Sequence, residues 1–345
     1  MLVGPDKYCL EHVDIEVNHQ CNLNCMHCSA RAGSEGAENK LSLDELKNII
    51  RSAQQIGLKK LGLTGGEPLL DIERVSEIAH FCRADEELSL HIHTNGTLIQ
   101  ERSAEMVELL AFFDAVSVTF LGADQQTHDE VTGSKEAFGR AFEGVRILVE
   151  AGLPLTCYFV PTRGRCEGYA DLVSRLSCIG VKRIRALALA PSGRARPIYT
   201  RTVPTDDEIH SFEKSLMDLA ADEGMCIEAG YCTRLLMPQL SVLVGHERCT
   251  SGVDRVHINF KGDVFPCTAA SGIEELAVGN ARSSRLEELW FESPLLKTIR
   301  RTHDGTLDEC GSCVQRPRCR QGCLAYSCGV MSDSLKMYCP VMSQK

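Results

Sequence analysis

The sequence lacks the features that direct a chain to a membrane or out of the cell. No apolar run approaches the length needed to cross a bilayer, and no basic segment, apolar stretch and cleavage site open the chain. A basic stripe is also missing, because the net charge is −10 and the Lys and Arg residues are scattered. We therefore expect a cytoplasmic protein with neither nucleic acid nor a membrane as partner.

Internal repeats and low-complexity segments are absent too, whereas cysteine is abundant, with 18 residues in 345. In a secreted chain this number would indicate disulfides, but thiols of a chain without an export signal stay reduced. We interpret many of the cysteines as metal ligands. The length suits one large α/β barrel with an appendage, or two ordinary domains.

Short apolar runs alternate with amphipathic stretches through the first two thirds of the chain. The clearest helix is predicted from the N-cap Ser42, with its capping-box partner Glu45, to a stop at Gly57. Such alternation predicts parallel strands joined by right-handed crossovers. The predicted strands begin near Val13, Lys59, Leu88, Asp114, Pro154 and Lys182.

Six such units predict an α/β fold, a partial (β/α)6 TIM-like barrel whose chemistry lies in the loops that follow the strands. We expect this barrel to cover residues 1–204, and a linking helix and strand region to cover residues 205–248. The remainder, residues 249–345, is predicted to be a small cysteine-rich domain built around metal instead of a hydrophobic core.

The segment CNLNCMHC follows the first predicted strand and places Cys21, Cys25 and Cys28 in one loop. A structural zinc site normally uses four ligands, whereas a cubane iron-sulfur cluster with three protein ligands leaves one iron open. Zinc completed by His27 or a distant cysteine is the alternative. The pattern favours the cluster.

This CxxxCxxC loop resembles the signature of the radical S-adenosylmethionine (radical SAM) enzymes, and Gly65-Gly66-Glu67-Pro68 matches their GGE motif. The resemblance covers the whole barrel region. It implies a [4Fe-4S] cluster whose free iron binds SAM and cleaves it to a 5′-deoxyadenosyl radical, which abstracts a hydrogen atom from the substrate. Paired glycines let a backbone approach a ligand closely, and exposed carbonyls with a carboxylate can receive an ammonium group.

The resemblance also implies contacts with SAM. Gly65, Gly66 and Glu67 are expected to meet the methionine amino group, and the His27 backbone to meet the adenine. Relatives with an HDxxR pattern bind the SAM carboxylate through its Arg, but here His128-Asp129 is followed by Thr132. The remaining candidates are Thr94, Asn95 and Ser117 (or Thr119) near SAM and its ribose, and Arg163 or Arg194 for the carboxylate, either of which could also be a surface charge.

Cysteines with regular spacing return near the end of the chain. Together with Gly262 they resemble the SPASM extension of radical SAM enzymes, which implies two auxiliary [4Fe-4S] clusters; a pair of zinc knuckles is the alternative. By that pattern, the first auxiliary cluster is held by Cys249, Cys267 and Cys323, with Cys328 or Cys232 as candidate fourth ligand, and the second by Cys310, Cys313, Cys319 and Cys339.

The remaining six cysteines and two histidines are expected to have structural roles. The alternating His91 and His93 share one strand face and are expected to be a hydrogen-bonded structural pair more than substrate contacts. The cysteines predicted to be small buried apolar residues are Cys9, Cys82, Cys157, Cys166, Cys178 and Cys226.

The predicted reaction is hydrogen abstraction from a peptide or a small natural product, with the substrate electron passing to the auxiliary clusters. Redox-neutral epimerisation is one alternative. Porphyrin side-chain modification is another, because Pro191 to Ala195 resembles a motif of haem-synthesis relatives. Sulfatase-maturing relatives place Asp at the position of Thr268, so the sequence disfavours sulfatase maturation as the function.

An iron-sulfur electron carrier is the non-enzymatic alternative, but a carrier has no need of a GGE motif. A reductant such as flavodoxin or ferredoxin is expected as partner. Because the stretch before the first strand is short, a leader-peptide-binding domain would have to come from a separate protein.

Overall fold

A computed structural model describes residues 8–35, 38–221, 225–230, 249–304 and 323–326. Within these residues ten strands form one sheet in the order β10-β9-β8-β1-β2-β3-β4-β5-β6-β7. The strands are β1 (His12–Glu16), β2 (Lys60–Thr64), β3 (Ser89–Thr94), β4 (Ala115–Phe120), β5 (Leu155–Phe159), β6 (Arg183–Ala186), β7 (Cys226–Ala229), β8 (Arg255–Ile258), β9 (Asp263–Phe265) and β10 (Gly279–Asn280).

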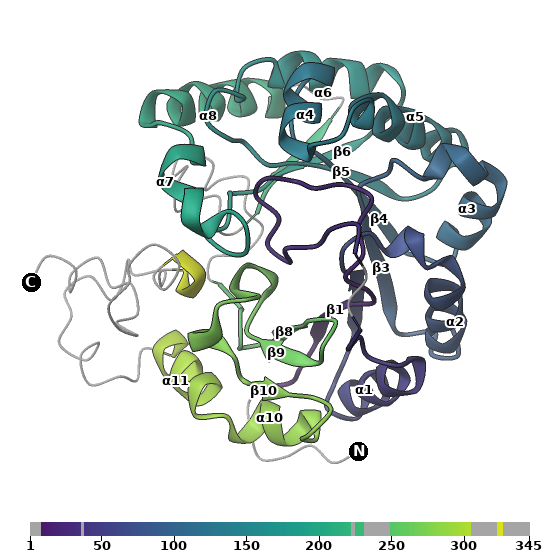
Figure 1. Ribbon diagram of the computed structural model, residues 1–345, viewed down its shortest axis with the longest axis vertical. Helices are drawn as coiled ribbons and strands as arrows, with labels where there is room; N and C mark the ends of the chain where they lie inside the picture. Colours follow the sequence, from purple (N-terminus) through teal and green to yellow (C-terminus); the bar gives the residue numbers. More distant parts are fainter. Residues whose placement is uncertain (1–7, 36–37, 222–224, 231–248, 305–322, 327–345) are drawn as a thin grey trace, which may run out of the picture.

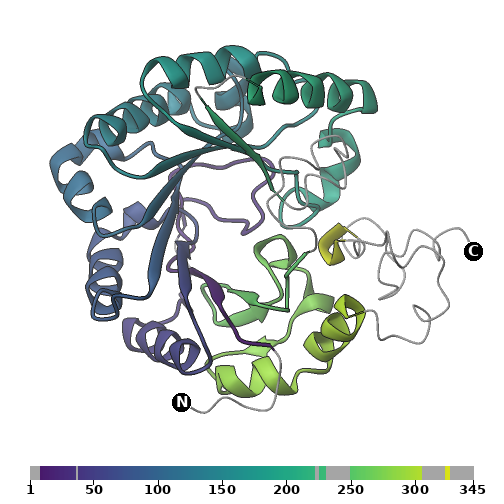
Figure 2. The same cartoon turned by 180° about the vertical axis from the view of Figure 1, so that it is seen from behind.

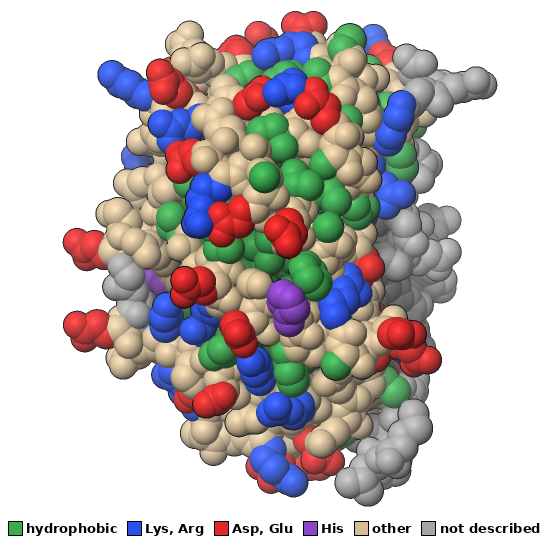
Figure 3. Space-filling view, turned by 90° about the vertical axis from the view of Figure 1, so that its right-hand side faces the viewer, with side chains coloured by type: hydrophobic (Ala, Val, Ile, Leu, Met, Phe, Trp, Pro, Cys, Tyr) green, Lys and Arg blue, Asp and Glu red, His purple; other side chains and the backbone are tan. Residues whose placement is uncertain are grey.

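The helices lie outside the curved sheet, and the loop after β1 lies inside the ring (Figure 1). They are α1 (Leu43–Gln55), α2 (Ile72–Cys82), α3 (Ser103–Leu110), α4 (Gln125–Thr132), α5 (Ala137–Glu150), α6 (Tyr169–Cys178), α7 (Tyr199–Thr202), α8 (Asp206–Ala220), α10 (Leu286–Glu292) and α11 (Pro294–His303). None of the described helices is long and apolar enough to cross a membrane. The face over α2 and α3 mixes both signs of charge (Figure 3).

The six predicted strands are present as β1 to β6, and they pair in parallel. The predicted α/β partial barrel is therefore confirmed. The first helix begins after Ser42, whose hydroxyl accepts from the Glu45 amide while the Glu45 carboxylate accepts from the Ser42 amide, as the capping box predicted.

The sheet has four strands besides the six predicted ones, and two of the four are parallel to the barrel strands. β7 pairs in parallel with β6, and β8 pairs in parallel with β1, so residues after Cys249 join the sheet at its start (Figure 2). Trp290 of α10 is 1% exposed in the main core, and its Nε1 donates to the Tyr8 carbonyl at 3.0 Å. The described part of the cysteine-rich region thus has a hydrophobic core in common with the barrel; the exact domain boundaries stay a prediction.

Side chains alternate strictly between the two faces of the parallel strands. On β1, Val13 and Ile15 lie in the core beneath the helices, so His12, Asp14 and Glu16 point to the other face. The same alternation places His91 and His93 of β3 on that inner face. Parallel strands buried on both faces are apolar throughout, whereas here the inner face of the barrel, which we call the lumen, is polar.

Three of the six cysteines predicted to be buried are exposed, so that prediction was wrong for them. Cys82, Cys157 and Cys166 are buried as expected. The exposed ones lie at the margins of elements, where the sheet or helix ends and neighbours cover less of the side chain. They are Cys9 before β1, Cys178 at the end of α6 and Cys226 at the start of the edge strand β7.

Candidate functional site

The cysteine loop leaves β1 at its C-terminal end and is tied back on itself. The Cys21 amide donates to the Gly33 carbonyl at 2.7 Å. The Cys21 Sγ accepts from the Leu23 amide at 3.4 Å and faces the Asn95 Nδ2 at 3.9 Å. Hydrogen bonds to a sulfur favour its thiolate form, the form that binds iron.

The three thiols form a group that suits a metal cluster. The pKa of Cys25 is raised to about 12 by burial and then by Cys28 and Cys21, and burial raises the pKa of Cys21 to about 11. Desolvated thiolates this close together form readily only where a cation compensates them. Among the described residues no three metal-binding side chains converge on a point for a single ion; in a cubane each thiolate binds a different iron.

Gly65 and Gly66 are required by the approach of the chain after β1. A Cβ on Gly65 would lie 2.6 Å from the Asn18 carbonyl oxygen, and one on Gly66 would lie 2.1 Å from that of Gln20. Gly65 also has a φ of +149°, a backbone conformation that side chains disfavour. The glycines therefore seat the β2 loop against the cysteine loop, as well as leaving carbonyls available for a ligand.

Glu67 ties three loops together from a completely buried position, with 0% exposure. Its Oε1 accepts from the Leu69 amide at 3.0 Å and from the Thr94 hydroxyl at 2.7 Å, and its Oε2 accepts from the Asn95 amide at 2.7 Å. The structure thus brings Glu67, Thr94 and Asn95 together, while their contacts with SAM stay a prediction. The carboxylate positions the β3 loop, and the Glu67 carbonyl already accepts from Asn18 Nδ2 at 2.8 Å and from the Leu70 amide at 3.2 Å.

Other predicted SAM contacts lie apart from that cluster. Ser117 is buried on the lumen face of β4, in register with His93. The exposed Arg163 donates from Nε to the Val203 carbonyl at 3.0 Å. Arg194 lies against the cysteine loop, where it binds backbone carbonyls.

His27 of the cysteine loop has a buried Nδ1 with no hydrogen-bond partner among the described residues. The pKa of His27 is lowered to about 4 by burial and then by Arg194 and His128. It is therefore neutral, and its ring has a polar atom left over for a ligand.

A second group of cysteines gathers beyond β9. Burial and then the thiols of Cys323 and Cys249 raise the pKa of Cys267, so these three side chains are close neighbours. The Cys249 thiol also donates to the Ser251 hydroxyl at 3.1 Å. This donor set fits the predicted first auxiliary cluster. The remaining predicted ligands, Cys310, Cys313, Cys319, Cys328, Cys339 and also Cys232, lie outside the described residues.

The lumen holds polar residues that the sequence analysis did not assign to the site. Lys60 of β2, Tyr158 of β5 and Arg185 of β6 all alternate with core residues. Arg185 pairs with Glu228 of β7. The signal was available as a period of two in HVDIE, SLHIHT and RIRA, which is unusual for strands of a parallel sheet.

Asp14 lies at the centre of several contacts in this lumen. Its Oδ1 lies 3.0 Å from His12 Nε2, and its Oδ2 accepts from the Thr268 hydroxyl at 3.3 Å. A Cβ on Gly62 would lie 2.2 Å from Asp14 Oδ1, so Gly62 makes room for the carboxylate. Although burial raises the pKa of Asp14, the nearby His12, which is hydrogen-bonded to the carboxylate, holds it well below its usual range.

The predicted histidine pair is not formed by the contacts described. His91 Nε2 lies 2.9 Å from the Ser89 hydroxyl, whereas the His93 ring lies 5.8 Å from the Tyr158 ring. Burial is the first cause that lowers the pKa of each. Both are therefore neutral lumen residues at pH 7, able to donate or accept hydrogen bonds.

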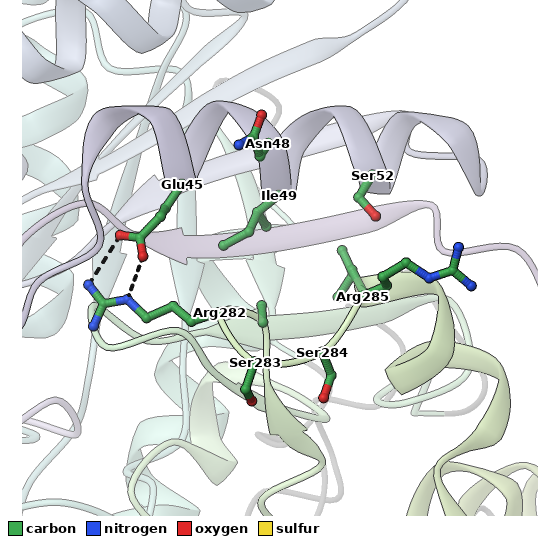
Figure 4. A pocket seen from close by; sticks show the side chains of 10 residues that line it. Glu45, Asn48, Ile49, Ser52, Arg282, Ser283, Ser284 and Arg285 are labelled. Carbon is green, nitrogen blue, oxygen red and sulfur yellow. Dashed lines mark hydrogen bonds and ion pairs between the residues drawn. The ribbon is translucent and has the colours of Figure 1, made fainter.

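A separate groove lies on the outside of the barrel, between α1 and the loop from β10 to α10 (Figure 4). Arg282 crosses it: Nε lies 3.0 Å from Glu45 Oε1, and the two terminal nitrogens donate to the carbonyls of Asn39 and Lys40. No predicted ligand lines this groove. It is a contact between the cysteine-rich region and the first helix.

Two family models match the chain. Residues 15–165 match the radical SAM superfamily, and residues 249–314 match SPASM, an iron-sulfur cluster-binding domain. The chain therefore contains a radical SAM domain and a SPASM domain, as its motifs predicted. The predicted cofactors, [4Fe-4S] clusters and SAM, are the cofactors of these two domains.

Curated relatives and a solved structure span nearly the whole chain. An AdoMet-dependent heme synthase from Methanosarcina barkeri is 29% identical, with 93% of each chain covered. A PqqA peptide cyclase from Granulibacter bethesdensis is 25% identical over 92% of this chain and 81% of the relative. SuiB from Streptococcus suis, solved bound to its precursor peptide SuiA, has the same fold, with a TM-score of 0.72 at 19% identity over 94% of this chain and 74% of SuiB.

Proposed function

We propose that this protein is a radical SAM/SPASM oxidoreductase that oxidises or cross-links a peptide or a small polar natural product. The observation that carries the proposal is the polar lumen between two groups of cysteines. One group follows β1 at the C-terminal end of the parallel strands. The other flanks the β8–β9 hairpin, with Cys249 before the start of β8 and Cys267 just beyond the end of the returning β9.

Cys21, Cys25 and Cys28 are proposed to hold the SAM-binding cluster, and Cys249, Cys267 and Cys323 an auxiliary one. When bound, these cofactors supply a 5′-deoxyadenosyl radical at one end of the lumen and an electron acceptor at the other. The backbones of Gly65, Gly66, Glu67 and His27, with Thr94, Asn95 and Ser117, are proposed to surround SAM. The partner of the SAM carboxylate stays a prediction, with Arg163 and Arg194 both held to backbone carbonyls.

The lumen residues have two tasks in such a reaction: they bind the substrate, and they take up the proton that net oxidation releases. The Asp14 carboxylate suits both tasks, since it is ionised and its side chain keeps 18% exposure. Its low pKa makes it a weak base in general. It is strong enough where the oxidised substrate before deprotonation is a protonated carbonyl, which is a strong acid.

The substrate class is argued from the lumen walls. His12, Asp14, Lys60 and His93 offer charges and hydrogen bonds, which match peptide groups and polar natural products. A porphyrin has large apolar faces, which would remove water from these polar walls without offering hydrogen bonds in return. The PqqA peptide cyclase relative and the structure of SuiB bound to its peptide SuiA support a peptide substrate. The proposed partners are a separate leader-binding protein and a flavodoxin or ferredoxin reductant.

Porphyrin side-chain modification is the second candidate. It is favoured by the heme synthase relative, whose 29% identity extends over 93% of both chains. A cytoplasmic location is proposed for the protein with either function.

The test is an anaerobic assay with reconstituted protein, SAM, dithionite and one candidate substrate at a time, either a short peptide or a carboxylated porphyrin. We expect 5′-deoxyadenosine and a peptide product lighter by two hydrogens. A product whose mass is unchanged in H2O but gains one deuterium in D2O would establish epimerisation instead. Turnover of the porphyrin alone would establish the second candidate. A protein that forms no 5′-deoxyadenosine under any condition would be an electron carrier.

A further inference from the structure

The loop after β6 is bound to the cysteine loop by one arginine. Arg194 donates from its backbone amide to the Cys28 carbonyl at 2.9 Å, from Nε to the Cys25 carbonyl at 2.7 Å, and from Nη1 to the Ala32 carbonyl at 2.6 Å. A single residue therefore binds three carbonyls spread over eight residues of a loop that has no helix or strand of its own.

The same cysteine loop is held from the opposite side by the end of α4. The Met26 amide donates to the Val131 carbonyl at 2.9 Å, and the Asn24 amide donates to the Thr132 carbonyl at 2.9 Å. In a trans peptide the carbonyl and the following amide point in opposite directions. The Cys25–Met26 peptide is thus fixed between Arg194 on its carbonyl side and α4 on its amide side.

Gly193 lets the β6 loop come this close. Its φ is +54°, and a Cβ at this position would lie 2.3 Å from the Cys28 carbonyl oxygen and 2.2 Å from that of Ser29. A side chain there would push Arg194 away from the cysteine loop. Gly193 and Arg194 therefore act as one unit.

The other end of the same loop contacts the auxiliary-cluster region. The Tyr326 hydroxyl, three residues after Cys323, donates to the Leu189 carbonyl, and the Tyr326 ring packs edge-on against Tyr199 at 5.9 Å. The β6 loop thus contacts the SAM-cluster cysteine loop directly and, through Tyr326, the segment that follows Cys323; it also contains the Pro191 to Ala195 motif.

We propose that Arg194 is a positioning residue for the SAM-binding cluster: it clamps the carbonyls of the cysteine loop so that Cys25 stays in place beside Cys21 and Cys28. This role differs from the SAM-carboxylate contact predicted from the sequence. It also places a permanent positive charge beside the cluster, which favours the more negative reduced state.

Arginine suits this task because its planar fork donates to two acceptors in fixed directions, whereas lysine offers a single point charge on a flexible stem. The two properties can be separated by substitution. Arg194→Met removes both the fork and the charge, and Arg194→Lys removes the fork but keeps the charge.

The experiment measures iron release to a chelator and the reduction potential of the SAM-binding cluster in reconstituted holoprotein, with SAM as the only added ligand. The variant with Cys21, Cys25 and Cys28 all changed to Ala gives the release curve of the auxiliary clusters, which is subtracted. Partners of metal ligands typically change metal affinity about 10- to 100-fold. We expect Arg194→Met to lose the SAM-binding cluster about 10- to 100-fold faster and to lower its potential.

We expect Arg194→Lys to lose the cluster faster than wild type while it keeps a near-wild-type potential. The matched control is Arg196→Met, two residues along the same loop, where the guanidinium faces Glu275 at 3.8 Å; it should match wild type in both measurements. Equal release from Arg194→Met and wild type would overturn the proposal. So would equal loss of all clusters together with a lower unfolding midpoint, because that result would indicate a general structural role. Neither measurement needs a substrate, so the outcome is independent of the proposed reaction.

Discussion

Asp14 provides a prediction at the scale of one side chain. Asp14→Asn keeps the shape and the hydrogen bonds to His12 and Thr268, but the amide cannot take up a proton. With the peptide that is turned over in the substrate assay, product formation should fall about 100- to 10,000-fold, as for loss of a general base. Formation of 5′-deoxyadenosine should stay within a few-fold of wild type, because the SAM-binding loops lie elsewhere.

Thr268 supplies the matched controls for this prediction. Thr268→Ser keeps the hydroxyl that donates to Asp14 Oδ2 and should retain product formation, whereas Thr268→Val loses the hydroxyl and should lower it about tenfold, the effect of roughly one hydrogen bond. If Asp14→Asn forms product at the wild-type rate, the proton leaves by another group and Asp14 only binds substrate.

His128 connects a single buried ring to the pH dependence of folding. It is 1% exposed, its Nδ1 accepts from the Leu121 amide at 3.1 Å, and burial lowers its pKa to about 4. The pKa of a histidine in the unfolded chain is about 6.5. Between these values the unfolded chain binds more protons than the folded one, so the free energy of unfolding falls as the pH falls from about 6.5 to about 4.

We therefore expect the urea midpoint of wild type to drop over this pH window and that of His128→Gln to drop less. The His27 and His91 rings have similarly lowered pKa values and account for part of the remaining drop. His210→Gln, a change on the exposed face of α8, should follow the wild-type curve. Parallel curves for wild type and His128→Gln would show that His128 is not the titrating group.

At the scale of elements, Arg282 joins the cysteine-rich region to α1. It contacts Glu45 and two backbone carbonyls at the start of that helix (Figure 4). Arg282→Ala should lower the free energy of unfolding by about 1 kcal/mol, since the groove is partly open to water. The measurement is the denaturant midpoint at matched cluster content.

Arg285→Ala, three residues further along the loop, is the control. Its side chain is 70% exposed, and its Nε lies 3.1 Å from Glu288 Oε1, a surface pair that contributes little. A loss of stability no greater in Arg282→Ala than in Arg285→Ala would mean that the two regions are held together by their shared core alone.

Local sequence patterns predicted the elements well. The period of two in VDIEV and the capping box at Ser42 are short-range signals, and both correspond to structure. The cysteine and GGE motifs predicted which loops come together, because the ends of parallel strands meet at one edge of a barrel. What failed was the interpretation of single residues at element margins, such as Cys9 and Cys226, whose burial depends on neighbours far along the chain.

Contacts between distant segments could not be predicted in this way. Thr268 meets Asp14 across 254 positions, and Arg194 meets Cys25 across 169. Neither pair has a spacing or a composition that marks it in one sequence. The parallel pairing of β8 with β1 belongs to the same class, since the sequence of RVHI does not say which edge of the barrel it joins.

At the scale of the whole molecule, the proposed reaction assigns separate tasks to the two cysteine groups. The barrel loops supply the groups that SAM cleavage requires, and these loops lie at the C-terminal ends of β1, β2 and β3. Of the described auxiliary cysteines, Cys249 precedes β8, Cys267 follows β9 and Cys323 lies after α11. Cleavage of SAM and oxidation of the substrate should therefore be separable by substitution.

The double variant Cys310→Ala and Cys313→Ala tests this division. Both residues lie outside the described part of the chain and are predicted ligands of the second auxiliary cluster. The variant should still form 5′-deoxyadenosine with the peptide but little product, since the electron left on the substrate has lost its acceptor. Its iron content should be about eight per chain against about twelve for wild type, at four per cubane.

Because a cluster in a small domain can contribute folding free energy outright, circular dichroism and the denaturant midpoint must match wild type before the result is interpreted. A folded variant with eight irons and full product formation would mean that the second auxiliary cluster is structural, and that the electron leaves through the cluster beside Asp14 and Thr268.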